Sequence, residues 1–229
     1  MISPRLQRRL LRHHLPLGLL SIGSGAVLFL TRPYSDVITK LSFASAWPGL
    51  VLIAFTLLIG PFKILRGKQI LRGKQIWGRN VAVSQDFRRD VGIWAGMMGV
   101  FHAVIGNCVH LRGRPWLYYV YEHWAKEHAQ PFRHDIFGLA NYTGLVSALV
   151  LLTLLATSND ASLRALGTPG WKSLQRWNYA VFGFLIVHTL AYQLGIERPI
   201  GALISLAVMA TIVTLMLQGI GYFKRRGAI

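Results

Sequence analysis

Long apolar segments that carry at most one charged side chain restrict how this chain can fold. Six such segments occur, at about residues 15–30, 47–62, 91–110, 135–156, 177–195 and 199–218. A hydrocarbon core of ~30 Å is crossed by a helix of about 20 apolar residues. A span in lipid must satisfy its own backbone hydrogen bonds, so each segment is expected to be helical. The sequence therefore predicts an all-α membrane protein, a six-transmembrane-helix bundle forming a single domain over residues 1–229.

Composition agrees with a membrane protein and bears on its partners. The chain is 53% hydrophobic, and only 14% of its residues are charged, well under the usual quarter for soluble domains. The formal net charge is +17, which in a soluble domain would indicate nucleic acid. Here the basic residues flank the apolar segments. We therefore expect anionic lipid at the cytoplasmic face and no nucleic-acid partner.

The basic residues also predict an orientation. Eighteen of the 25 lysines and arginines precede the first segment, follow the sixth, or lie between the second and third or the fourth and fifth. Cytoplasmic loops carry the excess of lysine and arginine. Both termini are thus expected in the cytoplasm of a bacterium, with the chain crossing the inner membrane several times. Six spans require both termini on one side, so the span count and the charges agree.

Two histidines, His102 and His188, lie deep inside apolar segments. Their segments are predicted to start near Val91 and Trp177 on the same side of the membrane. Each ring is then 11 residues in, or ~16 Å at 1.5 Å per residue. An ionisable residue at such depth indicates a functional site, and two facing imidazoles are the usual axial ligands of a b-type haem iron. Hydrogen bonding between helices and proton transfer are the alternatives.

Four further polar residues are predicted at the outer surface. His110 ends the third segment, His134 opens the fourth, and Arg112 and Arg114 lie between them. They are candidates to bind haem propionates, or they are ordinary interfacial polar groups.

The basic N-terminal stretch contains two adjacent histidines, His13 and His14. These are expected to face solvent or lipid headgroups.

Part of the chain, about residues 48–195, resembles the ferric reductase-like transmembrane domain. The likeness is greatest to the haem-binding membrane subunit of the bacterial periplasmic methionine sulfoxide reductase system. It is carried by short blocks in order: Arg88-Arg89-Asp90-Val91-Gly92 before Phe101-His102, then Leu155-Ala156-Thr157-Ser158-Asn159, Arg164, Leu166-Gly167, Trp171-Lys172, Leu174-Gln175-Arg176, Tyr179 and His188.

This resemblance implies a b-type haem domain that passes electrons across the membrane. In that family the fifth helix begins with a histidine thirteen residues before the second one. Here the first position is Gln175 and the second is His188. An amide is a poor ligand for haem iron, so one haem is expected between His102 and His188. The glutamine puts a second haem, on the cytoplasmic side, in doubt.

The sequence also limits the electron donor. No G-x-G-x-x-G follows a strand-like segment, so no nicotinamide site of the Rossmann kind is expected. Electrons must then come from quinol, from reduced flavin or from a separate reductase. We expect an electron-transfer subunit rather than a complete enzyme. It would deliver electrons to a periplasmic-side acceptor, which is a separate redox partner protein or a larger membrane complex.

Two alternative functions remain open. The chain would be a non-catalytic structural subunit of a larger membrane complex if Gln175 marks a partly lost haem site. It would be a stand-alone metal reductase if the acceptor is a periplasmic ferric complex.

Overall fold

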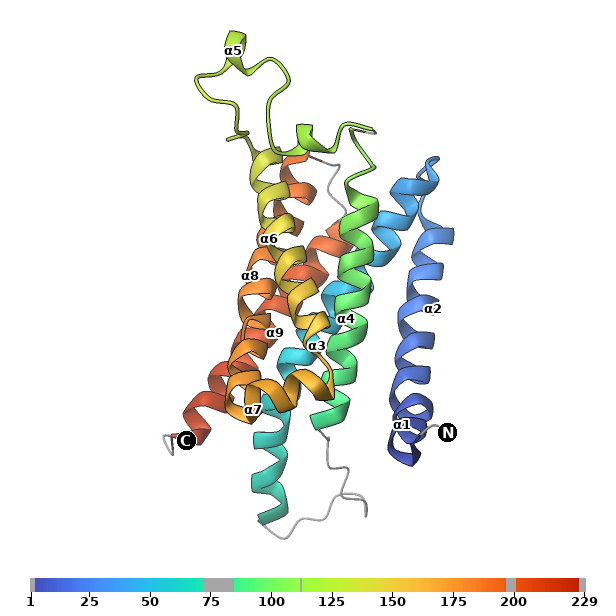
Figure 1. The fold of residues 1–229 in the computed structure, drawn as a ribbon, viewed down its shortest axis with the longest axis vertical. Helices are drawn as coiled ribbons and strands as arrows, with labels where there is room; N and C mark the ends of the chain where they lie inside the picture. The colour runs from blue at the N-terminus through green and yellow to red at the C-terminus, as the bar shows by residue number, and fades with distance from the viewer. Residues whose placement is uncertain (1–2, 72–84, 112, 197–200, 227–229) are drawn as a thin grey trace.

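The computed structural model describes residues 3–71, 85–111, 113–196 and 201–226, and this part of the chain is almost wholly helical (Figure 1). It contains no named β-strand, only an isolated bridge between Val120 and Phe132. The elements, in chain order, are α1 (Pro4–Arg9), η1 (Leu10–His14), α2 (Leu15–Thr31), α3 (Val37–Leu71), α4 (Gln85–Gly106), η2 (Pro115–Tyr118), α5 (Trp124–Glu127), α6 (Ile136–Ala156), α7 (Asp160–Gln175), α8 (Asn178–Ala191), η3 (Tyr192–Ile196) and α9 (Gly201–Arg225).

Five helical segments of the described residues are long and apolar enough to cross a membrane. They are Pro4–Thr31, Val37–Phe62, Ile136–Ala156, Asp160–Ile196 and Ile204–Lys224. The prediction of an all-α membrane protein is confirmed at this level.

The third predicted segment is helical but is not one of these five. It corresponds to α4, which starts six residues before the predicted 91–110 and ends at Gly106. Its first turns carry Arg88, Arg89 and Asp90, and four glycines lie within it. These residues make α4 less apolar than its neighbours. It nevertheless lies inside the bundle, where it packs against α3 and α6.

Helix α3 is much longer than the predicted segment 47–62. It continues through Pro48 and Pro61 to Leu71, although the Gly60-Pro61 pair had indicated an end. A proline in a buried helix frees one backbone carbonyl, which neighbouring helices and polar side chains can satisfy. Because α3 contacts α2, α4, α8 and α9, it has such neighbours along its length.

The amphipathic helix α7 was not predicted. Asn159 caps it by accepting a hydrogen bond from the backbone N–H of Ser162 at 2.8 Å. Gly167 has a φ of 63°, which bends the helix two residues before Pro169; this left-handed conformation favours glycine. Helix α7 ends at Gln175, and the chain turns before α8 begins at Asn178.

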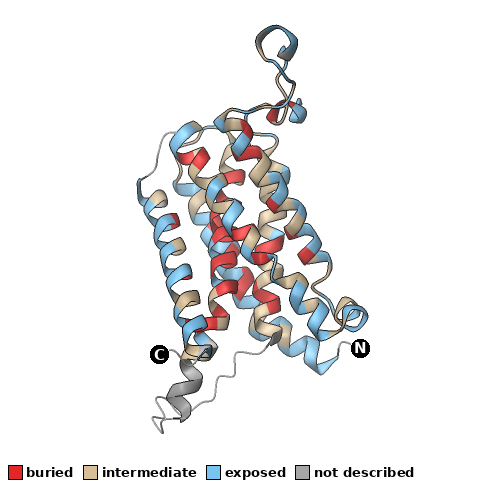
Figure 2. Cartoon of the chain, turned by 90° about the vertical axis from the view of Figure 1, so that its left-hand side faces the viewer, coloured by how far each residue is buried: buried red, intermediate tan, exposed pale blue. Residues whose placement is uncertain are grey.

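The buried core lies in the middle of the bundle, as Figure 2 shows. Ile53 and Leu57 of α3, Val91 of α4 and Val181 of α8 are each at most 2% exposed. In contrast, α2 and α9 expose many leucines, valines and methionines. Such outward apolar faces suit lipid rather than water. Both described chain ends lie at the same end of the bundle, with α7 beside them and the α5 loop at the opposite end (Figure 1).

Candidate functional site

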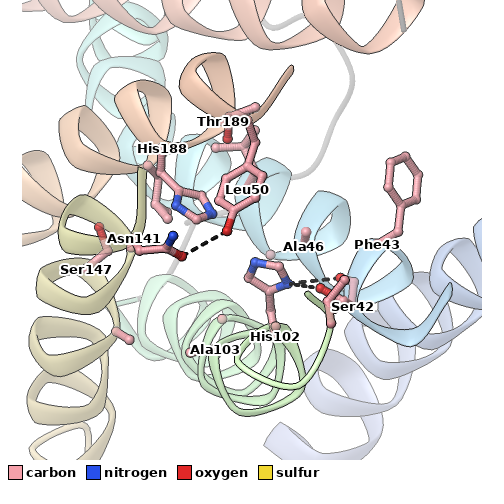
Figure 3. A pocket seen from close by; sticks show the side chains of 18 of the residues that line it. Ser42, Phe43, Ala46, Leu50, His102, Ala103, Asn141, Ser147, His188 and Thr189 are labelled. Atoms are coloured by element: carbon pink, nitrogen blue, oxygen red, sulfur yellow. Dashed lines mark hydrogen bonds between the residues drawn. The ribbon is translucent and has the colours of Figure 1, made fainter. Parts of the chain in front are cut away.

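The two intrabundle histidines meet in the structure. His102 comes from α4 and His188 from α8, and their ring centroids are 6.0 Å apart with 77° between the ring planes. Figure 3 shows the two rings approaching one pocket from different helices. The sequence predicted that these rings lie at matched depth, and they are indeed neighbours.

Each imidazole is held through the same ring atom. His102 Nδ1 lies 2.9 Å from the backbone oxygen of Ser42 and 3.3 Å from the Ser42 hydroxyl. His188 Nδ1 lies 2.7 Å from the backbone oxygen of Ala140. A carbonyl oxygen only accepts hydrogen bonds, so Nδ1 carries the proton in both rings. The Nε2 lone pair of each ring is therefore the free ligand, as in metal-binding histidines that donate their other N–H to a carbonyl.

The rings border a cavity of about 170 Å³. Small residues of α4, namely Gly99, Ala103 and Gly106, form part of its wall and leave room beside His102. Apolar side chains such as Phe43, Leu50 and Leu151 form much of the rest. The cavity also reaches a set of polar side chains: Tyr34, Thr39, Asn107, His110, Tyr119, Asn141, Tyr192 and Gln193.

Gly144 of α6 leaves the space that the His188 ring occupies. A Cβ at this position would lie 2.8 Å from His188 Nδ1 and 2.9 Å from Cε1. Real side-chain contacts are not that short, so only glycine fits beneath the ring. Nothing in the sequence pattern singled out Gly144, because its importance depends on which residue of α8 faces it.

The outer candidate residues separate into two groups. His110 lines the cavity and stacks on Tyr192, with ring centroids 5.9 Å apart and 16° between the planes. The Tyr192 ring in turn lies 5.0 Å from that of His188. His110 is therefore connected to the histidine pair by one aromatic ring.

His134 and Arg114 lie elsewhere. His134 packs against Tyr121 and His128 in the connection between α4 and α6. Arg114 pairs with Glu122 at 2.5 Å. Neither lines the cavity in the part of the chain that the structure describes. Arg112 lies outside the described residues.

A second polar cluster, not predicted, lies at the end of the bundle that carries the termini. The Asp90 side chain is fully buried. It accepts hydrogen bonds from Arg9, lies 2.7 Å from His13 Nδ1, and lies 3.2 Å from His14 Nε2. The two histidines thus face this carboxylate rather than solvent or headgroups, so that expectation was wrong. The π-helical turn η1 brings both of these adjacent side chains to a single acceptor.

The donor set at the first site fits a haem. Two imidazoles that held one metal ion from opposite sides would have ring centroids on the order of 6 Å apart, because each metal–nitrogen bond is about 2 Å and each ring adds about 1 Å. The observed separation is 6.0 Å. Both Nδ1 atoms are already engaged, and the surrounding wall is mainly apolar. When bound, haem iron supplies reversible one-electron chemistry.

No protein-family model matches the chain.

Proposed function

We propose that this chain is a membrane b-type cytochrome subunit of the ferric reductase-like kind, with one haem between α4 and α8. His102 and His188 are the axial ligands of this proposal. The single observation that supports it is the pair of imidazoles whose Nδ1 atoms are bonded to carbonyls, which leaves both Nε2 atoms for a metal. The two imidazoles would hold a haem iron whose other four nitrogen ligands come from the porphyrin, and the haem would supply one-electron redox chemistry.

The chain's own residues have distinct roles in this proposal. Ser42 and Ala140 fix the protonation and direction of the two rings through their backbone carbonyls. The apolar residues around the cavity exclude water and lower the local dielectric, which is one of the ways a protein sets a haem potential. His110 lies on the side where the cavity becomes polar, and we assign it to the propionate end.

The proposal includes an orientation in the bacterial inner membrane. In this proposal the chain crosses six times, with α4 as the third crossing, so both termini share one side. The excess of lysine and arginine on that side makes it the cytoplasm, and the α5 loop would then lie in the periplasm. Electrons would arrive from quinol, reduced flavin or a separate reductase, and leave to a periplasmic-side partner.

Haem content of purified variants tests the assignment. His102→Ala and His188→Ala each remove one axial ligand, so we expect both variants to lose at least nine-tenths of the haem retained by the unmodified chain. His128→Ala is the matched control, because His128 lies in the outer loop against Tyr121. Haem content should be measured per chain by pyridine haemochrome on folded, monodisperse protein. Full haem in His188→Ala would exclude the assignment.

A structural subunit is the second candidate, and Gln175 is the residue that favours it. Its Nε2 is buried without a hydrogen-bond partner among the described residues. If the unmodified, well-folded chain binds no haem, this second function is preferred.

A further inference from the structure

The carbonyl that holds each histidine also accepts a side-chain hydroxyl. Ser45 Oγ shares its proton between the backbone oxygens of Leu41, at 2.8 Å, and Ser42, at 3.0 Å. The Ser42 oxygen is the one bonded to His102. Thr143 Oγ1 likewise shares its proton between the backbone oxygens of Leu139, at 2.8 Å, and Ala140, at 2.9 Å. The Ala140 oxygen is the one bonded to His188. Both arrangements contain an imidazole, a carbonyl and the hydroxyl three residues further along the helix. His102 Nδ1 additionally lies 3.3 Å from the Ser42 hydroxyl.

A carbonyl oxygen has two lone pairs, so its donors compete. The hydrogen bond from each hydroxyl therefore weakens the hydrogen bond that the same carbonyl accepts from the imidazole N–H. The Nδ1–H bond of the imidazole is then less polarised, and Nε2 is a weaker electron donor to a metal. Second-shell hydrogen bonds of this kind tune a bound metal without touching it.

We infer that Ser45 and Thr143 are positioning residues that raise the reduction potential of the haem. This inference rests on the function proposed above. Neither residue lines the cavity, so neither would contact the haem. Their effect would pass through one carbonyl and one imidazole on each side.

The direction of the effect follows from charge. Removing the hydroxyl lets the carbonyl accept more strongly from Nδ1–H, which gives the ring more imidazolate character. A more basic ligand stabilises Fe(III) relative to Fe(II). The potential therefore falls when either hydroxyl is removed.

The experiment compares midpoint potentials of Ser45→Ala, Thr143→Val and the unmodified chain by spectroelectrochemical titration. Each variant is expected to raise the ratio of Fe(III) to Fe(II) at a fixed ambient potential by roughly threefold. This corresponds to a negative shift of about 30 mV for one electron. Thr143→Ser restores the hydroxyl and should restore the potential.

Two matched controls separate this effect from loss of a helical hydroxyl in general. Ser24 Oγ donates to the backbone oxygens of Leu20 and Ser21, and Thr157 Oγ1 donates to those of Thr153 and Leu154. None of these four carbonyls holds a histidine among the described residues. Ser24→Ala and Thr157→Val should leave the potential unchanged.

A readout on the haem-free protein adds an independent check. In Thr143→Val, the proton on His188 Nδ1 forms a stronger hydrogen bond, so its NMR resonance should move downfield. The same shift is expected for His102 in Ser45→Ala.

The outcomes distinguish the two proposals. Haem bound at an unmoved or more positive potential in Ser45→Ala and Thr143→Val would overturn this inference and leave the haem assignment intact. Equal shifts in the control variants would also overturn it. An unmodified chain that binds no haem would overturn the proposed function, and the inference with it.

Discussion

At the residue scale, the central feature is the tautomer that the backbone imposes on two histidines. The depth of His102 and His188 was predictable, because it depends only on counting along two apolar segments. The carbonyls of Ser42 and Ala140 were not predictable, because they come from α3 and α6 and meet the rings only after the bundle has packed. The same is true of Gly144, whose lack of a side chain matters only beneath the His188 ring.

Gly144→Ala tests whether the position of the His188 ring determines haem affinity. The added Cβ would push the ring away from the cavity, and overpacking of this kind costs about 1–3 kcal/mol. Haem affinity is therefore expected to fall roughly tenfold or more, since each tenfold corresponds to about 1.4 kcal/mol. The measurement is a haem titration of the haem-free protein.

Gly183→Ala on α8 is the control, because a Cβ there would meet nothing within 4 Å. It should bind haem as the unmodified chain does. Equal affinity in Gly144→Ala and Gly183→Ala would show that the ring position does not limit binding.

At the element scale, the fold depends on contacts that periodicity does not reveal. The positions of α2 and α6 followed closely from hydropathy, because the ends of these helices coincide with the ends of apolar segments. Helix α7 did not, because its basic, glycine- and proline-containing sequence has the composition of a loop. Its amphipathic pattern was the signal that could have revealed it. The packing of the N-terminal segment against α4 was also not predicted, because its partner Asp90 lies far away along the chain.

Asp90→Asn should release the N-terminal segment from α4. Asp90 is fully buried and faces Arg9, His13 and His14. Removing one partner from a buried ionic group costs on the order of 3 kcal/mol, because the remaining charges lose their compensation. Hydrogen exchange of the amides of residues 4–14 in detergent is expected to become markedly faster.

Asp86→Asn is the matched control. Asp86 pairs with Arg5, whose side chain is 60% exposed, and at 3.4 Å with Arg89 of its own helix. Only the Arg5 pair reaches the N-terminal segment, and exposed pairs contribute about 0–1 kcal/mol. Exchange in residues 4–14 should change little in this variant. If the amides of residues 4–14 exchange at the same rate in Asp90→Asn and Asp86→Asn, the buried cluster around Asp90 does not hold the N-terminal segment in place.

At the scale of the whole molecule, the predicted topology and the structure agree in part. All-helical architecture and multiple candidate spans are confirmed, and both described chain ends lie at one end of the bundle (Figure 1). The number of crossings depends on α4, whose glycines and charged first turn lower its hydropathy although it lies in the core. Neighbouring helices surround much of α4, and a mean hydropathy calculated along the sequence does not include such contacts.

Labelling of cysteines tests whether α4 crosses the membrane. Cys108 is exposed just after α4 and is the single cysteine of the chain. In intact cells with a permeable outer membrane, a membrane-impermeant maleimide is expected to label it. Ser173→Cys in α7, in a Cys108→Ala background, should react only after the inner membrane is disrupted. Labelling of both cysteines from the same side would contradict the six-span topology.

The most direct test of the haem assignment is the difference spectrum, dithionite-reduced minus oxidised, of the purified chain with haem counted per polypeptide. The expected result is a b-type spectrum with one haem per chain, because His102 and His188 would hold one haem and Gln175 stands where a second haem would need a histidine. A folded preparation without haem, or one with two haems per chain, would contradict it.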